Sequence, residues 1–285
     1  MSPDNKGPHV SIILPACNSA DGLPAAIESI LNQTYPDFEL IIVDDGSTDA
    51  TPWLLAIQTD PRIVVIRHPE QQGIARACNT GIGAACGEFV GFISSNDEWD
   101  RMKLEEQVTR FANLPTEYGV VYSDVWECTP AGNRAYWHSP EMDSPDLLNF
   151  YATDFQAGTL GTGPLLIRRS FLESAGPFDE QLRYSSDTDM IIRLQRLCRF
   201  HHIEKPLCIS RSRETHSANP FERSISQLFL LQKYPETLEN PVFLAYQLDR
   251  IGRNLRQARE CSPAATGRVT QESDRVQFRQ PVSEL

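Results

Sequence analysis

Short apolar runs alternate with longer amphipathic segments along the first half of the chain. A run of about five apolar residues closed by a turn is typical of a buried strand. The predicted strands cover residues 10–14, 38–43, 63–66 and 89–93. Between them, apolar residues recur at helical spacing, which indicates helices packed on one face. These predicted helices cover residues 23–31, about 48–57 and about 74–85.

Strands that alternate with helices form right-handed βαβ units. We therefore predict an α/β fold, Rossmann-like, with a mostly parallel central sheet flanked by helices. A helix at 102–111, strands at 120–122 and 165–167, and a short helix that Gly176 ends continue this pattern. Proline, glycine and aromatic residues are scattered from 129 to 163, which predicts a loop-rich region over a site.

Helical periodicity returns after residue 187 and persists almost to the end of the chain. Helices are predicted from about 187 to 197, 225 to 231 and 243 to 256. The last stretch is polar and aperiodic, which is typical of disorder. We predict a main domain over residues 1–215, a C-terminal helical extension over 216–260, and a disordered tail over 261–285.

Polar clusters follow the first, second and fourth predicted strands. They read "PACNS", "DDGSTD" and "SSND". The carboxyl ends of parallel strands share one edge of the sheet, where ligands bind in such folds. Each cluster alone fits an ordinary turn or helix cap. Three clusters on one edge predict a ligand-binding rim.

Two carboxylates in these patterns suit specific chemistry. Asp97 ends the oxygen-rich "SSND" segment, and a hard divalent cation such as Mg²⁺ or Mn²⁺ prefers oxygen ligands. Asp187 lies at the start of a predicted helix, where it could act as a general base. Its position near a helix N-terminus predicts a lowered pKa. Plain helix capping is the alternative for both residues.

Composition excludes several classes of protein. The 285-residue chain has a formal net charge of −12, which disfavours binding to nucleic acid. No apolar run is long enough to span a bilayer, and the first residues lack a signal-peptide pattern. The seven cysteines are odd in number and lack CxxC spacing, which favours a reducing compartment and a cytoplasmic location. None of the six histidines shows metal-ligand spacing.

Three segments in order resemble one enzyme family. They read "VSIILPACNSADGLPAAIESILNQTYPDFELIIVDDGSTDAT", "GIARACNTGIGAACGEFVGFISSNDEW" and "RRSFLESAGPFDEQLRYSSDTDMIIRL". Together they are similar to the inverting family 2 glycosyltransferases, which have the GT-A fold. The resemblance covers about residues 8 to 215.

The resemblance implies a role for several residues. Those placed around the nucleotide of the sugar donor are Pro15, Ala16, Asn18, Asp45, Arg76 and Asn79. Asp97 takes the last position of the Asp-x-Asp-Asp segment of the family, where a metal on the donor diphosphate is held. Asp187 takes the position of the catalytic base.

The chain also departs from the family pattern. Ser94 and Asn96 stand where the metal segment usually has aspartates, which removes two negative charges. Asn96 can still ligate through its carbonyl, and Ser94 can hydrogen-bond a ribose. Ser186 replaces a usual glutamate. The family often has a histidine near the C-terminal edge of this region, and either Arg213 or His216 could take its place here. Weaker metal dependence, a changed donor preference and lost activity are the three outcomes that these changes allow.

The resemblance implies transfer of a sugar from a nucleotide-diphosphate donor, with a lean to UDP, to an acceptor hydroxyl with inversion. The acceptor is a carbohydrate, lipid-linked or other molecule. A non-catalytic protein that binds nucleotide sugars is the alternative, favoured by Ser94 and Asn96. A nucleotidyltransferase ranks last, because "PACNSADG" lacks the basic residue of a phosphate loop. The glycine-rich "GTLGTG" at 158–163 is expected to be a flexible loop near the acceptor.

Overall fold

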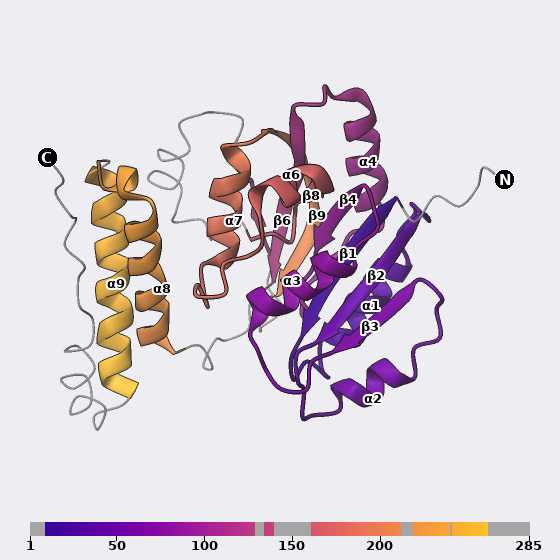
Figure 1. Ribbon diagram of the computed structural model, residues 1–285, viewed down its shortest axis with the longest axis horizontal. Helices are drawn as coiled ribbons and strands as arrows, with labels where there is room; N and C mark the ends of the chain where they lie inside the picture. Colours follow the sequence, from indigo (N-terminus) through magenta and orange to yellow (C-terminus); the bar gives the residue numbers. More distant parts are fainter. Residues whose placement is uncertain (1–8, 129–133, 140–160, 212–218, 240, 262–285) are drawn as a thin grey trace, which may run out of the picture.

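The computed structural model of the protein describes residues 9–128, 134–139, 161–211, 219–239 and 241–261. These residues form one nine-stranded sheet with helices on both of its faces (Figure 1). The predicted α/β fold is therefore confirmed. Its first four strands are β1 (Val10–Ala16), β2 (Phe38–Asp44), β3 (Ile63–Arg67) and β4 (Phe89–Phe92). They lie in the order β3-β2-β1-β4 and all pair in parallel.

The second half of the sheet is mixed rather than parallel. Its strands are β5 (Glu98–Trp99), β6 (Tyr118–Cys128), β7 (Arg134–Trp137), β8 (Leu166–Arg168) and β9 (Arg199–Arg211). The short strand β8 is antiparallel to both β4 and β6, so it joins the two halves. Beyond it, β9 runs parallel to β6 and pairs with β5 in the antiparallel sense.

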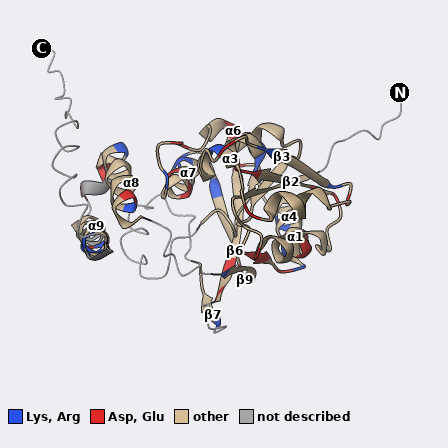
Figure 2. Ribbon diagram, turned by 90° about the horizontal axis from the view of Figure 1, so that it is seen from below, with Lys and Arg blue, Asp and Glu red and all other residues tan. Residues whose placement is uncertain are grey.

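The sheet is covered by one layer of helices on each face, as the edge-on view shows (Figure 2). One layer contains α1 (Leu23–Leu31), α2 (Thr51–Ala56) and α4 (Lys103–Asn113), whose apolar residues share one core cluster. The other contains α3 (Ile74–Ala84), α6 (Arg169–Ala175) and α7 (Ser186–Gln195), which share a second cluster.

Alternation along the first strand explains how both layers are anchored. Ile12 and Leu14 belong to the first cluster, and Ile13 belongs to the second. All three side chains are fully buried. A strand covered on both faces must be apolar at successive positions, which is why "VSIILPA" reads as a continuous apolar run.

Three helical segments follow the sheet. They are α8 (Pro220–Lys233), the 3-10 helix η2 (Pro235–Glu239) and α9 (Pro241–Cys261). A third apolar cluster attaches α8 and α9 to α7 and contains Leu182, Ile192, Leu230, Leu231, Tyr234 and Ile251. The two long helices lie side by side at the edge of the molecule, beyond α7 (Figure 1).

The structure extends or corrects several predicted elements. The strand predicted at 120–122 is part of the 11-residue β6, and the 13-residue β9 was not predicted at all. Helix α8 begins earlier than expected, because Asn219 accepts a hydrogen bond from the Phe221 amide and Pro220 occupies the first turn. Of the tail predicted to be disordered, 261–285, Cys261 is the last residue of helix α9, and 262–285 lie outside the described residues.

No helix among the described residues combines the length and the apolar content that crossing a membrane requires.

Candidate active site

The loops after β1 and β2 are joined by side-chain hydrogen bonds. Asn18 Oδ1 accepts from the Thr48 amide at 2.8 Å, and the Asn18 amide donates to Ser47 Oγ at 2.9 Å. Asn18 has a φ of 46°, a left-handed conformation that asparagine tolerates better than most residues. The Ser19 amide also donates to Thr51 Oγ1 at 2.9 Å. Asn18 therefore fixes one loop against the other.

Pro15 and Ala16 lie at the carboxyl end of β1, directly before this loop. The Ala16 carbonyl accepts a hydrogen bond from the Asp45 amide at 2.8 Å. Ala16 is buried, and Pro15 is partly exposed. Both residues therefore belong to the predicted rim at the carboxyl edge of the sheet.

Asp44 and Asp45, of which the resemblance places Asp45 at the donor nucleotide, are both buried. Asp44 Oδ1 accepts from the Ser47 amide at 3.0 Å, which holds the turn. Asp45 Oδ1 lies 2.7 Å from His68 Nδ1 and accepts from the Gln72 amide at 2.9 Å. Its Oδ2 accepts from the Gly73 amide at 2.8 Å. Asp45 thus holds the loop that leads into α3.

Arg76 and Asn79 project from α3 toward the segment that precedes α7. Arg76 Nη1 lies 3.2 Å from Glu180 Oε1, and Asn79 Nδ2 donates to the same oxygen at 2.9 Å. Asn79 also exchanges two hydrogen bonds with the backbone of Phe178. Arg76 and Asn79 therefore connect α3 to the segment that leads into α7, the helix that carries Asp187.

The loop after β4 packs against the loop after β1. Ser95 Oγ donates to Ser19 Oγ at 2.7 Å. A Cβ at Gly22 would lie 2.6 Å from the backbone carbonyl oxygen of Ser95, so only glycine allows this approach. Ser94 is exposed, and Asn96 is half-buried. All three predicted polar clusters therefore meet, as their common sheet edge predicts.

Asp97 is held by the far end of β9. Its Oδ1 accepts from the Arg211 amide at 3.0 Å. Burial raises the pKa of Asp97 to about 6, and hydrogen bonds from the Arg211 amide and the Ser210 side chain offset part of that effect. This carboxyl would bind a cation only in its ionised form.

Asp187 lies in the first turn of α7 and is half-buried. Burial raises the pKa of Asp187, against the opposing effects of the Thr188 hydrogen bonds and the charge of Arg250 on α9. The prediction of a lowered pKa from the helix N-terminus is therefore wrong, because desolvation outweighs the helix dipole here. A raised pKa makes this carboxylate a stronger base.

Two glycines of one short segment lie beside the two carboxylates, Gly161 near Asp187 and Gly163 near Asp97. A Cβ on Gly161 would lie 3.6 Å from Asp187 Oδ2, and a Cβ on Gly163 would lie 4.0 Å from Asp97 Oδ2. Since two residue steps span at most ~7 Å and each Cα–Cβ bond adds about 1.5 Å, the two carboxyl oxygens are no more than roughly 18 Å apart. This segment is the end of "GTLGTG", whose first residues, 158–160, lie outside the described part of the chain.

Asp189, two residues beyond Asp187, forms a charged cluster that sequence reasoning missed. This carboxylate is fully buried. It accepts from Arg193 Nε at 2.9 Å and from the Tyr234 hydroxyl at 2.7 Å, and it lies 2.7 Å from Lys233 Nζ. Burial would lower the pKa of Lys233, but hydrogen bonds to Asp179 and Asp189 raise it. The cluster therefore attaches the end of α8 to α7.

The structure does not decide between the two candidates for the histidine position of the family. Arg213 and His216 both lie outside the described residues. Ser186, the residue before Asp187, is buried at the start of α7.

Solved structures share this fold. S. aureus TarS 1-349 in complex with UDP-GlcNAc superposes with a TM-score of 0.65 at 19% identity, over 85% of this chain and 72% of that one. The mannosyltransferase PcManGT from Pyrobaculum calidifontis, in complex with GDP-Man and Mn²⁺, gives a TM-score of 0.60 at 21% identity, over 96% and 82%. The fold is therefore that of the GT-A glycosyltransferases.

Sequence similarity assigns the family. Residues 11–175 match the model of glycosyl transferase family 2, and the chain belongs to this family. Among its relatives, the Escherichia coli enzyme WfgD, a UDP-Glc:alpha-D-GlcNAc-diphosphoundecaprenol beta-1,3-glucosyltransferase, is 38% identical over 112 residues. The alignment spans 39% of this chain and 44% of WfgD. The expected resemblance is thereby confirmed.

Proposed function

We propose that this protein transfers a sugar from a UDP-linked donor to an acceptor hydroxyl, with inversion at the anomeric carbon. The observation that carries the proposal is that Asp187 and Asp97 lie beside Gly161 and Gly163 of one short segment, while three loops interlock at the sheet edge that carries Asp97. UDP as the nucleotide is supported by WfgD, named for UDP-Glc, and by TarS in complex with UDP-GlcNAc.

In this proposal, Asp187 is the general base. It accepts the proton of the acceptor hydroxyl while that oxygen attacks the sugar from the side opposite the diphosphate. The raised pKa of Asp187 supports this role, because a base is most effective when its pKa lies closer to the working pH. A single displacement of this kind inverts the configuration.

The donor nucleotide lies along the rim in this proposal. Pro15, Ala16 and Asn18 contact its base and ribose, and Ser94 and Asn96 hydrogen-bond the ribose and the diphosphate. Asp45 acts on the nucleotide by fixing the start of α3, which carries Arg76 and Asn79. Arg76 offers a guanidinium to the phosphates when it leaves Glu180.

The oxygen groups near Asp97 fit a divalent cation. One carboxylate and the Asn96 amide oxygen are hard ligands, and Mg²⁺ or Mn²⁺ is commonly held by one carboxylate together with substrate phosphates. Gly163 leaves the space next to Asp97 Oδ2 free of a side chain. When bound, the cation neutralises charge on the departing diphosphate. PcManGT was solved with Mn²⁺, which supports this assignment.

A second function is favoured by Ser94 and Asn96, which leave a single carboxylate at Asp97 in this segment. In that case the protein binds nucleotide sugars without transferring them. Sugar transfer or donor hydrolysis with any nucleotide sugar would exclude this alternative.

We further propose that residues 1–215 form the catalytic unit and that 216–260 form a helical extension. The end of β9 at Arg211 and the start of α8 at Pro220 support this division. The seven cysteines, odd in number and without CxxC spacing, support a cytoplasmic location in this proposal.

Thermal unfolding with a nucleotide panel tests the donor assignment. We expect UDP and UDP-sugars to raise the melting temperature, and Mn²⁺ to add a further increase. A ligand at about 100 times its Kd adds about 2.7 kcal/mol to the free energy of unfolding. The Asp97→Asn variant should lose the Mn²⁺ increment, while Asp60→Asn, which removes a carboxylate that binds Arg62, should keep it. If no nucleotide raises the melting temperature, the proposal is wrong.

A further inference from the structure

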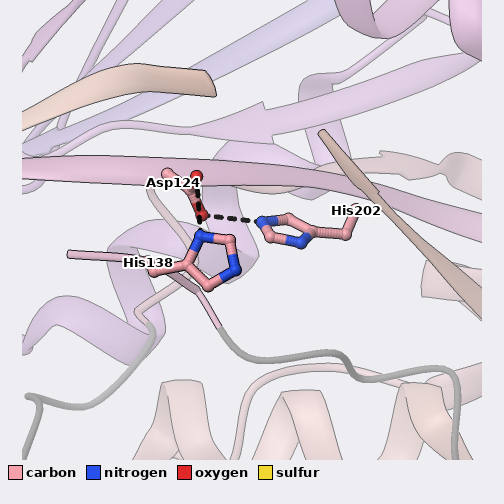
Figure 3. Close-up of side chains that lie close together, drawn as sticks. All are labelled: Asp124, His138 and His202. Atoms are coloured by element: carbon pink, nitrogen blue, oxygen red, sulfur yellow. Dashed lines mark hydrogen bonds and ion pairs between the residues drawn. The ribbon is translucent and has the colours of Figure 1, made fainter. Parts of the chain in front are cut away.

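A second group of side chains that could bind a metal belongs to none of the three polar clusters of the rim. Asp124 on β6, His138 just after β7 and His202 on β9 point toward one another (Figure 3). Their ligand atoms all lie within 4.8 Å of one another. Fourteen residues separate the first two, and His202 is 64 residues further along, so the fold alone brings them together.

The chemistry of this cluster differs from that of the donor site. It offers two imidazole nitrogens and one carboxylate, a ligand set that suits Zn²⁺ and related transition metals. Mg²⁺ and Ca²⁺ prefer sites built from oxygen alone. A metal bound here would therefore be of a different class from the one that Asp97 suits.

Surrounding groups hold the carboxylate in place. Asp124 is fully buried, accepts from the Tyr136 hydroxyl at 2.5 Å, and accepts from the Ser139 amide at 2.7 Å. The His202 ring also contacts this carboxylate, so three neighbouring groups fix its orientation. Outer hydrogen bonds of this kind orient the first ligands of metal sites.

The two imidazoles are placed differently. The His202 ring is nearly buried and stacks on Tyr122, with centroids 4.8 Å apart and planes at 10°. Its Nε2 lies 2.7 Å from Asp124 Oδ1. The His138 side chain is 61% exposed, and its Nδ1 lies 3.3 Å from Asp124 Oδ2. His138 therefore provides both a ligand and an open side through which an ion and its waters can enter.

We propose that Asp124, His138 and His202 form a binding site for a transition-metal dication of the zinc class, separate from the donor site. The ion replaces the contacts between the carboxylate and the two rings, and water completes a tetrahedral shell. It joins β6, the end of the β6–β7 hairpin and β9. Since β9 continues to Arg211, whose amide binds Asp97, the ion also stabilises a strand that supports the rim.

The alternative is a hydrogen-bonded Asp-His-His triad with no affinity for metal. Both arrangements use the same atoms, so metal binding itself must be measured. The proposal does not depend on sugar transfer, and its test uses no nucleotide.

The test is calorimetric titration of the full-length, metal-stripped protein with Zn²⁺. We expect one equivalent to bind with a Kd in the micromolar range or tighter. The His138→Ala variant should weaken binding at least ~10-fold. Because His138 is largely exposed, this variant keeps its fold, and thermal unfolding without metal verifies that. The matched control is His9→Ala, a histidine paired with Tyr35 and Glu88, and it should bind as the parent does.

Absorption spectroscopy with Co²⁺ tests which side chains bind the metal. Co²⁺ in place of Zn²⁺ should give the visible absorption of a tetrahedral site, and His202→Gln should abolish it. The Asp97→Asn variant should retain both Zn²⁺ binding and the Co²⁺ spectrum, since it alters only the donor site. The absence of stoichiometric Zn²⁺ binding overturns the proposal, and so does equal affinity in the His138→Ala and His9→Ala variants.

Discussion

The two halves of the sheet hold their functional residues by different means. In the parallel half, rim side chains bond mostly to backbone groups of neighbouring loops, as Asn18 does with Thr48 and Asp45 does with Gln72. These partners are 30 and 27 residues apart. In the mixed half, α7 is held by a side-chain cluster in which Asp189 bonds Tyr234, 45 residues away. Asp97, although part of the rim, also needs this half, because it accepts from the Arg211 amide 114 residues away.

Local contacts therefore position most of the proposed donor rim, and long-range contacts position Asp187. Each βαβ unit ends at the same sheet edge, so the donor rim follows from a local pattern repeated along the chain. Asp187, the proposed base, has no such pattern. Its position depends on α7, and α7 is fixed by Asp189 and by the apolar cluster that it shares with α8 and α9. The donor rim and the base should therefore fail independently.

The largest effect is expected at the base. The Asp187→Asn variant should lower the transfer rate by about 10²–10⁴-fold, the usual contribution of a general base, while UDP affinity is unchanged. Donor turnover and nucleotide titration measure the two quantities. Since burial raises the folded pKa of Asp187, its ionised form costs stability at neutral pH, and the variant should be no less stable than the parent. Turnover within twofold of the parent would remove Asp187 from the role.

A smaller, structural effect is expected at Asp189. The Asp189→Asn variant leaves Arg193 and Lys233 without their buried counter-ion, which should cost about 3–5 kcal/mol of unfolding free energy. Urea denaturation measures it. The control is Asp249→Asn, whose exposed pair with Arg253 is worth less than about 1 kcal/mol. Equal stability of the two variants would show that the cluster does not hold α7.

The parallel half can be tested through one glycine. Gly46 has a φ of 67°, and a Cβ there would lie 2.4 Å from the carbonyl carbon of Glu70. The Gly46→Ala variant should therefore lose about 2 kcal/mol of stability and most UDP binding, since the turn that holds Asp45 must shift. Gly83 in α3 has open space, so Gly83→Ala should gain about 0.5–1 kcal/mol. Unfolding curves of both variants with and without UDP provide the comparison.

The smallest effect concerns pH. The pKa of Asp187 is raised by burial and partly lowered by Arg250, and the base works only when ionised. Activity should therefore fall on acidification at a pH above the ordinary carboxyl value. The Arg250→Gln variant removes the opposing charge and should move this acid limb to higher pH. Arg253→Gln, which alters only the pair with Asp249, should leave the limb in place.

Most of the parallel half could be predicted from the sequence. Strands covered on both faces appear as apolar runs, and their helices show the 3.6-residue period. The predicted ranges 38–43 and 23–31 therefore match β2 and α1 to within one residue. The meeting of the three polar clusters followed from topology rather than from any single motif.

The mixed half was harder to predict, for physical reasons. Strand β9 contains a proline and several charged residues, and its burial alternates irregularly because β-bulges shift its register with β6. The sequence of such a strand therefore lacks the regular spacing of apolar residues from which a strand is predicted. The partners of Asp189 and of Asp124 come from elements 45 and 78 residues away, so only the folded chain reveals these clusters.

Gly161 and Gly163, which lie beside the two carboxylates, are positions at which the space next to Asp187 and Asp97 can be altered. Gly161 and Gly163 contribute no side chain there, and an added methyl would contact Asp187 and Asp97 at ordinary van der Waals distance. Successively larger residues at these positions would narrow the gap stepwise without changing either carboxylate. If the proposed reaction takes place in this gap, such substitutions would change the size of the sugar or acceptor that reaches Asp187.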